Sequence, residues 1–522
     1  MNLLAYIVRR FVPIGLVAGA GIFAIGAASP AATSRVEGIG VDLLGAPPSS
    51  IEEVETELNS IAQAGVKFVR IEMNWSWIES SPDIYNWSAK APMDLFLSSA
   101  SQRGIKTIAV LTGGPAYLDS SAGPIDETIL MERWIKFVQA AVDTFGEQVD
   151  IWEIGYQINS SSGSSPFLLP STPEAPTQPD PIFYTRLLKA ASKIIKTGDP
   201  NDQVWIGSLI SAAAGNCALN PLTYLLEING AKGWGSADAF SYQPSRGATA
   251  PEDLPNLAGN QACASSIAVP PGNMSAEVQS MKDLSRQLGG KPLYITGLKW
   301  SNEDLQVLRN NRAIEPGQFE SDLLVRASIM LMGNNTTPLI FWQIDPSDQW
   351  YAMTAMKNLN TILSDSKSIG QFQGQSGSVQ EYRFQKAGDE DIIAWRSSEG
   401  DSPQPVTLSN LDTRNITAFT SDSTNLSESA GSPLSVDESG NTILLLNERP
   451  VIFLLQPGGF DDQIKRSIMD QTDLWKIDLQ ESILHWINNQ KAAFLRSLDD
   501  LFNQAKENAI NWGEQKINDL LN

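Results

Sequence analysis

Between residues 35 and 370, short apolar segments alternate with amphipathic ones eight times, and this alternation restricts the fold more than any other feature of the chain. The apolar segments are rich in Val, Ile and Leu and are often bounded by Gly or Pro, which is typical of strands buried on both faces. Eight such strands with helices between them favour a closed (β/α)8 barrel over an open doubly wound sheet. The predicted strands are 38–44, 67–73, 105–112, 148–155, 203–210, 237–243, 291–296 and 338–345.

After residue 370 the apolar residues recur at every second position, which is the period of a half-buried strand. Short strands between polar turns indicate a small antiparallel β-sandwich over residues 371–457. The predicted strands are 379–385, 391–397, 405–408, 415–420, 442–447 and 450–455. Residues 458–522 contain no proline, and Ile487, Phe494 and Leu501 recur every seven residues, so this part is predicted to be a long helical tail.

The first 34 residues indicate export. Arg9 and Arg10 precede an uncharged run over residues 11–34, which at about 1.5 Å per residue is long enough to cross the roughly 30 Å core of a bilayer. The two arginines would keep their side of the segment in the cytoplasm and place the rest of the chain outside. Two interpretations are favoured over a helix buried in a soluble protein: a retained transmembrane signal anchor, or a signal peptide cleaved near the small residues 27–32. Either one predicts an extracytoplasmic protein, anchored to the membrane or secreted.

Composition and motifs exclude several classes of function. The chain of 522 residues carries 37 Lys and Arg against 59 Asp and Glu, a net charge of −22 that argues against nucleic-acid binding. Its one histidine, His485, rules out an H-E-x-x-H zinc site and makes a Ser-His-Asp system untenable. No glycine-rich nucleotide-binding motif follows a predicted strand. We therefore predict no metal and no cofactor.

The two cysteines, Cys217 and Cys263, are too few to hold a zinc or iron–sulfur centre by themselves. Because both fall in the exported part of the chain, we predict that they form a disulfide, with two free thiols as the alternative.

Five segments of the barrel region resemble the retaining β-glycosidases of the large glycoside hydrolase clan, in particular the xylosidase- and cellulase-like barrels with an accessory β-sandwich. The matching segments are V-R-I-E-M-N-W-S-W-I-E (69–79), V-D-I-W-E-I-G-Y-Q-I-N (149–159), 183–200, D-A-F-S-Y-Q-P (238–244) and G-K-P-L-Y-I-T-G-L-K-W (290–300). The resemblance runs from about residue 36 to 456, and it implies a (β/α)8 barrel whose site lies at the carboxyl ends of the strands.

The resemblance also implies two catalytic carboxylates, one as acid/base and one as nucleophile, about 5–5.5 Å apart. At the end of the fourth strand, Gln157 stands at the acid/base position and Tyr156 replaces the family's asparagine. Gly297 stands at the nucleophile position on the seventh strand, and Gln243 and Ser245 replace the histidine and tyrosine of the sixth. Glutamine has no titratable proton and glycine has no side chain. The chain is therefore predicted to be a catalytically degenerate member.

Other carboxylates near the strand ends could in principle take over. Glu72 on the second strand and Asp345 after the eighth are the candidates for a relocated pair. The alternative for Glu72 is a structural ion pair with Arg70, two residues away on the same strand face. Arg70 is also a candidate to bind substrate. Glu153, four residues before Gln157, would lie about 13 Å deeper in the barrel.

Several tryptophans fall at predicted strand ends, where sugar rings stack in related barrels. Trp77, Trp300 and Trp342 are the candidates for saccharide binding, and packing in the core is the alternative for each.

These observations favour a protein that is not an enzyme and that acts in saccharide binding or as a structural or assembly subunit. Residues 461–522 carry 7 basic and 11 acidic side chains, so a protein partner or self-association suits the helical tail better than an anionic lipid surface. A tail folded back on its own barrel is the alternative. The second function hypothesis is an active glycoside hydrolase on β-linked saccharides that uses a relocated acid and nucleophile.

Overall fold

The computed structural model describes residues 35–44, 48–89, 92–118, 126–160, 168–169, 178–211, 218–255, 272–310, 312, 314–346, 349–373, 379–386, 389–396, 403–409, 411, 416–424, 426, 431–437 and 440–455. The predicted N-terminal helix, the helical tail, Cys217 and Cys263 lie outside these residues, so the predictions about them remain predictions. The domain boundary at residue 370 also remains a prediction. None of the helices in the described part of the chain combines the length and apolarity needed to cross a membrane.

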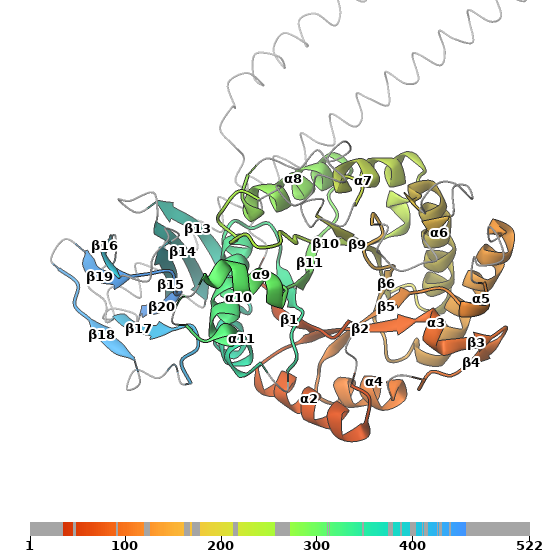
Figure 1. Cartoon of the computed structure of the whole chain (residues 1–522), viewed down its shortest axis with the longest axis horizontal. Coiled ribbons are helices and arrows are strands. Elements are labelled where there is room, and N and C mark those ends of the chain that lie inside the picture. Colours follow the sequence, from red (N-terminus) through yellow and green to blue (C-terminus); the bar gives the residue numbers. More distant parts are fainter. Residues whose placement is uncertain are drawn as a thin grey trace, which may run out of the picture. The chain divides into compact units, whose positions relative to one another are not determined.

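Eight parallel strands close into a barrel, as predicted (Figure 1). Around the barrel the order is β1, β12, β11, β10, β9, β6, β5 and β2, so each strand lies beside its neighbours in the chain series and β12 closes onto β1. The strands are β1 (Gly38–Asp42), β2 (Phe68–Asn74), β5 (Lys106–Thr112), β6 (Ile151–Ile154), β9 (Gln203–Ile210), β10 (Ala239–Gln243), β11 (Leu293–Leu298) and β12 (Leu339–Trp342).

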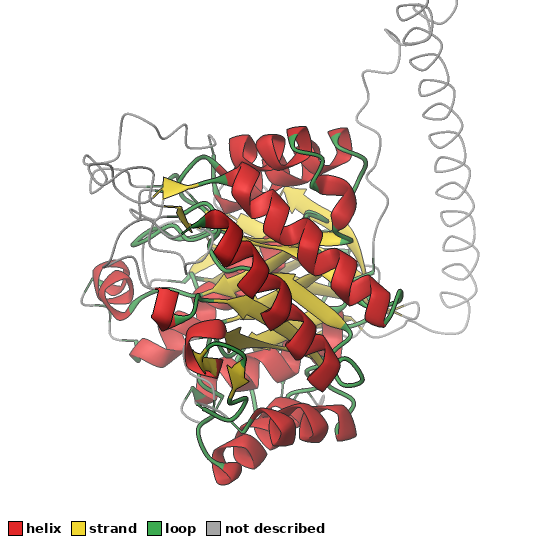
Figure 2. Ribbon diagram, turned by 90° about the vertical axis from the view of Figure 1, so that its right-hand side faces the viewer, coloured by secondary structure: helices red, strands yellow, loops and turns green. Residues whose placement is uncertain are grey.

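Helices cover the outside of the barrel (Figure 2). They begin at polar capping residues: Ser50 caps α2, Asp180 caps α6 and Asn220 caps α7, each accepting a hydrogen bond from a backbone N–H in the first turn. The helices are α2 (Ile51–Gln63), α3 (Trp75–Ile78), α4 (Met93–Gln102), α5 (Glu127–Phe145), α6 (Pro181–Gly198), α7 (Pro221–Gly230), α8 (Met274–Gln287), α9 (Asn302–Arg309), α10 (Pro316–Gly333) and α11 (Trp350–Leu363), with 3₁₀ turns η1 (Ala116–Leu118) and η4 (Trp234–Ser236).

The barrel interior is apolar near the amino ends of the strands and polar toward their carboxyl ends. Phe68, Ile151, Ala239 and other strand residues form a separate apolar cluster, in which the rings of Trp205 and Tyr294 stack with centroids 4.2 Å apart. Two residues further along the same strand faces come Arg70, Glu153 and Ser241. The polar layer therefore occupies the end of the barrel at which the sequence places the site.

The antiparallel part also agrees with the prediction of a β-sandwich. A six-stranded sheet has the order β13 (Lys367–Gln373), β14 (Val379–Lys386), β15 (Asp389–Arg396), β20 (Val451–Leu455), β17 (Ile416–Thr420) and β18 (Ser432–Leu434). A two-stranded sheet pairs β16 (Gln404–Leu408) with β19 (Thr442–Leu446), and apolar residues of both sheets share one core. Two small hairpins, β3 (Glu79–Ser81) with β4 (Ile84–Tyr85) and β7 (Leu168–Leu169) with β8 (Gln178–Pro179), are additional to the prediction.

Candidate functional site

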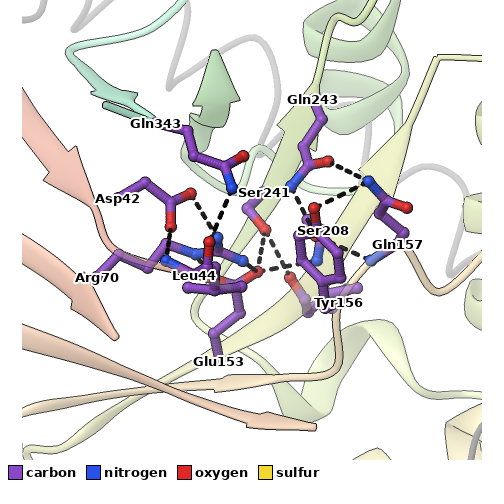
Figure 3. A network of polar contacts seen from close by, with 11 residues as sticks. Asp42, Leu44, Arg70, Glu153, Tyr156, Gln157, Ser208, Ser241, Gln243 and Gln343 are labelled. Carbon is purple, nitrogen blue, oxygen red and sulfur yellow. Dashed lines mark hydrogen bonds and ion pairs between the residues drawn. The ribbon is translucent and has the colours of Figure 1, made fainter. Parts of the chain in front are cut away.

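A buried ion-pair network lies beneath the mouth of the barrel (Figure 3). Arg70 of β2 donates from Nε and NH2 to the two carboxylate oxygens of Glu153 on β6, at 2.7 and 2.9 Å, and from NH1 to Asp42 of β1 at 2.7 Å. All three side chains are fully buried. Burial alone would lower the pKa of Arg70, but the charges of Asp42 and Glu153 outweigh it and raise that pKa.

This network corrects two predictions. Arg70 pairs with Asp42 and Glu153, whereas Glu72 accepts a hydrogen bond from Asn74 Nδ2 at 2.9 Å. Glu72 is two residues nearer the mouth, about 7 Å along the strand, while closure of the barrel brings Asp42 and Glu153 to the level of Arg70. Since Arg70 has no exposed surface and is held by two carboxylates, its placement also disagrees with a role in substrate binding.

Glu153 forms hydrogen bonds to residues of three other strands of the barrel. Its Oε1 also accepts from the backbone N–H of Ser208 at 2.9 Å and from the hydroxyl of Ser241 at 2.7 Å. A carboxylate that accepts hydrogen bonds from Arg70 and from two further donors has its oxygens occupied by contacts that link the strands of the barrel. It is therefore not available as a catalytic base.

Above this network, amide groups meet at the strand ends. Gln157 donates from Nε2 to Oε1 of Gln243 at 2.9 Å and to the hydroxyl of Tyr156 at 3.0 Å. The backbone N–H of Gln157 donates to Oγ of Ser208 at 3.0 Å, and Gln243 Nε2 donates to the same oxygen at 3.4 Å. We call Tyr156, Gln157, Ser208 and Gln243 the amide cluster. Figure 3 shows their side chains converging from β6, β9 and β10.

Gly297 on β11 lies against this cluster. Its φ is +61°, a left-handed conformation that side-chain-bearing residues rarely adopt. A Cβ at this position would lie 2.7 Å from Nε2 and 3.0 Å from Cδ of Gln243, closer than van der Waals contact. The end of the Gln243 side chain therefore occupies the space into which a residue at position 297 would project. The structure thus brings Gln157, Gln243 and Gly297 together as the sequence predicted.

Tyr156 is the titratable member of the amide cluster. Burial, followed by the negative charge of Asp42, raises the pKa of its phenol to about 12, and Glu72 adds to the effect. Its ring also lies beside the guanidinium of Arg70, 5.7 Å from centroid to Cζ. A phenol that holds its proton this strongly donates or accepts hydrogen bonds at neutral pH but does not transfer a proton readily.

The remaining predicted residues lie around the amide cluster or beyond it. Ser245 follows β10, is half-buried, and its backbone N–H donates to the Gln243 carbonyl at 2.9 Å. Asp345 is exposed beyond the end of β12, near enough to α2 that its charge helps to raise the pKa of Glu57 to about 7, after burial. Glu72 is half-buried on β2. The two candidates for a relocated pair therefore interact with different elements of the fold.

Two of the three predicted sugar-stacking tryptophans are buried. Trp342 has no exposed surface, and its indole N–H donates to Ser328 of α10 at 2.8 Å, so the side chain packs between the strand and the helix. Trp300 is 6% exposed and donates to the carbonyl of Thr249 at 3.1 Å. Both placements disagree with stacking on a sugar and agree with the packing alternative. Trp77 in α3 is partly exposed, and its role stays a prediction.

Two charged features were not predicted. Asp42 completes the Arg70 network, and its signal in the sequence is an acidic residue inside the apolar strand G-I-G-V-D. Glu320 of α10 is mostly buried, and burial raises its pKa to about 7 although Gln349 donates to it at 2.8 Å. Its signal is an acidic residue in the apolar run that follows Phe319. Among the described residues, no group of three or more His, Cys, Asp or Glu side chains is arranged to hold a metal ion.

Sequence comparisons give no relative: no protein-family model matches the chain, and no curated protein is similar to it. The fold, however, is shared with solved structures. A family 39 glycoside hydrolase from Bacteroides cellulosilyticus is 16% identical, with a TM-score of 0.57 over 81% of each chain. A family 30 endoxylanase from Clostridium papyrosolvens is 12% identical, with a TM-score of 0.53 over 81% of this chain and 97% of that one. A conserved exported protein from Bacteroides fragilis is 10% identical, with a TM-score of 0.53 over 81% and 98%.

At these identities the likeness concerns the fold and not the reaction. The resemblance predicted from the five sequence segments is confirmed at that level. The chain has the (β/α)8 barrel and β-sandwich architecture of glycoside hydrolases, and its amide cluster lies at the end of the barrel where that architecture carries its sites.

Proposed function

We propose that the chain is a glycosidase-like protein that binds saccharide and does not hydrolyse it. The observation that carries the proposal is the packing of Gln243 against Gly297 beside Gln157. Retaining hydrolysis needs two carboxylates flanking the glycosidic bond. Here one amide, Gln157, and one glycine, Gly297, stand at the two positions where the resemblance implies those carboxylates, and the space beside Gly297 is filled.

Restoring a carboxylate at position 297 would require two changes at once. The backbone would have to hold a side chain at a φ of +61°, and the amide of Gln243 would have to leave its bonds to Gln157 and Ser208. The nearest deep carboxylate, Glu153, is committed to Arg70. The local structure is thus adapted to the absence of the carboxylate.

The amide cluster suits recognition of hydroxyl groups. Gln157 donates both of its side-chain N–H groups within the cluster, so its Oε1 is the atom that can accept from a sugar hydroxyl. Tyr156, which is partly exposed, offers a further hydroxyl, while the buried Ser208 accepts from the backbone N–H of Gln157 and helps to position it.

Export, membrane anchoring and self-association are further parts of the proposal, and they rest on the sequence alone. The uncharged run over residues 11–34 supports an extracytoplasmic location, and the seven-residue apolar repeat in residues 458–522 supports assembly with a protein partner or with a second copy.

The test is a binding titration in which the ligand is afterwards analysed. Purified full-length protein is titrated calorimetrically with xylo- and cello-oligosaccharides, and the sugar is then examined by mass spectrometry. We expect binding of at least one oligosaccharide and its recovery intact. Shortened products would contradict the absence of hydrolysis, and a lack of heat across the whole panel would contradict saccharide binding.

A pair of matched variants locates the binding. Gln157→Ala removes the centre of the amide cluster and should weaken oligosaccharide binding about tenfold. Gln203→Ala makes the same change at the opposite end of the barrel, where the exposed Gln203 accepts from Trp205 Nε1 at 2.9 Å, and should leave binding unchanged. Equal effects of the two changes would place the sugar away from the barrel mouth.

A further inference from the structure

A pocket of about 290 Å³ lies where the barrel meets the β-sandwich, away from the amide cluster. Helix α10 of the barrel contributes Phe319, Asp322 and Arg326 to its walls. The turn between β19 and β20 of the sandwich contributes Glu448 and Arg449. Pockets at the junction of two packed units are frequent ligand sites, and this volume is at the small end of their range.

Ion pairs that cross the junction form the walls. Arg312 donates to Glu448 at 2.6 Å, and Arg449 donates to Asp322 at 3.1 Å and to Asp422 at 3.0 Å. These pairs keep the charged groups in fixed positions around the pocket, so they do not have to be ordered when a ligand arrives.

Arg326 has hydrogen-bonding capacity that these pairs do not use. Its Nε and NH2 bind both oxygens of Glu252, at 2.8 and 2.5 Å. Its NH1 lies 3.9 Å from Glu448, within ion-pair distance but beyond a hydrogen bond, and the charge of Asp322 also acts on Arg326. Arg326 is only 3% exposed, and it lines the pocket. Because Arg326 lines the pocket, an N–H group that makes no hydrogen bond to Glu252 can donate to a ligand there.

The charge balance of the pocket favours a neutral acceptor. Three guanidiniums, from Arg312, Arg326 and Arg449, face four carboxylates when the paired Glu252 and Asp422 are counted with Asp322 and Glu448. An added anion would meet this acidic excess, and a cation would meet the guanidinium of Arg326. A neutral molecule that both donates and accepts hydrogen bonds suits alternating donors and acceptors best.

We propose that this pocket binds a single neutral sugar ring. The hydroxyl groups of a sugar supply an acceptor for Arg326 and donors for the carboxylates, and the partly exposed Ile314 supplies an apolar wall for the C–H groups of the ring. The inference rests on the proposed saccharide binding and adds a second site to it, separate from the barrel mouth.

The test fills the pocket without removing an ion pair. Ile314 lines the pocket and is partly exposed, so Ile314→Trp should occupy its volume while the arginines keep their partners. Val307→Trp adds the same ring at a position of α9 that is 65% exposed, and it serves as the control. Full-length proteins are titrated with D-xylose and D-glucose, and with glucuronate and sulfate, by ligand-observed NMR.

We expect millimolar binding of D-xylose or D-glucose that falls at least tenfold in Ile314→Trp and is unchanged in Val307→Trp. Unchanged binding in Ile314→Trp, or no binding of either sugar by the wild type, would overturn the inference. Tighter binding of glucuronate or sulfate would overturn the assignment of a neutral ligand. If Ile314→Trp melts at a lower temperature than the control, Ile314→Phe replaces it and the same outcomes apply. Oligosaccharide binding that depends on Gln157, together with monosaccharide binding that Ile314→Trp leaves unchanged, would overturn this inference and leave the proposed function standing.

Discussion

Arg70 carries a positive charge into a part of the barrel that water does not reach, and Asp42 and Glu153 balance it there. Removing one partner of a buried pair leaves an uncompensated charge, which typically costs about 3–5 kcal/mol. We therefore expect Glu153→Gln to lower the free energy of unfolding by about 3–5 kcal/mol, measured by urea denaturation.

Glu72→Gln is the matched control for that prediction. It makes the same change on a neighbouring strand, at a half-buried carboxylate that accepts from the neutral amide of Asn74. We expect a loss of about 1 kcal/mol or less. Equal losses for the two variants would show that the Arg70 pairing contributes no special stability.

Glu320 predicts a pH dependence of stability. Burial raises its folded-state pKa from 4.5 to about 7, so between these values the folded protein holds a proton that the unfolded chain has released. Its contribution to stability is therefore greatest below about pH 4.5 and falls as the pH rises through 7. Glutamine does not ionise, so Glu320→Gln should not lose stability as the pH rises through 7.

The free energy of unfolding of Glu320→Gln, relative to wild type, should rise by about 2 kcal/mol from pH 5 to pH 8. The exposed Glu303→Gln on α9 is the control. A difference between Glu320→Gln and wild type that stays constant with pH would refute a raised pKa at Glu320.

Some residue-level features could be predicted from the sequence and others could not. At Gln157 and Gly297, the positions where the resemblance implies carboxylates, the lack of an acid group could be read directly, because a residue type is visible without any geometry. The partners of Arg70 were mistaken, because Glu72 is near in sequence whereas Glu153 is near only once the barrel is closed. The direction of Trp342 depends in the same way on α10 packing over β12.

The strands and helices followed the hydrophobic periods closely, since a strand buried on both faces leaves a continuous apolar run. The exceptions include strand ends and short elements. The eighth strand was predicted to reach residue 345 but stops at Trp342, which leaves Asp345 outside the barrel. Helices α3 and α9 were missed because eight residues or fewer give too little periodicity to detect. The longer helix α11 and strand β13 were also missed.

Contact between β9 and β6 leads to a prediction about one glycine. A Cβ on Gly207 would lie 2.2 Å from the carbonyl oxygen of Ile154 and 2.5 Å from that of Gly155, and backbone atoms cannot move aside as a side chain can. We expect Gly207→Ala to lower the free energy of unfolding by about 3 kcal/mol. Gly235→Ala in η4 has no atom within 4 Å of the added methyl and should cost less than about 1 kcal/mol.

Thermal and urea denaturation of the two glycine variants would check this. Similar stability of the Gly207 and Gly235 variants would mean that the two strands separate easily, which would contradict the tight packing of β9 against β6.

For the whole molecule, the barrel and the β-sandwich could be predicted because each has its own period and its own apolar core. The pocket between the barrel and the β-sandwich could not be predicted. Its walls combine Arg326 with Glu252 and Arg449 with Asp322, pairs separated by 74 and 127 residues, and no local pattern in the sequence reports such contacts. The sandwich therefore does more than flank the barrel, because it completes a cavity that neither part forms alone.

The central claim is that this glycosidase-like barrel has no glycosidase chemistry. The most direct measurement is the release of p-nitrophenol from aryl β-xylosides and β-glucosides by the purified full-length protein. We predict a rate equal to that of the blank without protein, for the wild type and equally for Glu72→Gln and Asp345→Asn. Turnover by the wild type that Glu72→Gln or Asp345→Asn abolishes, and that Gln157→Ala leaves intact, would contradict the account and establish a relocated active site.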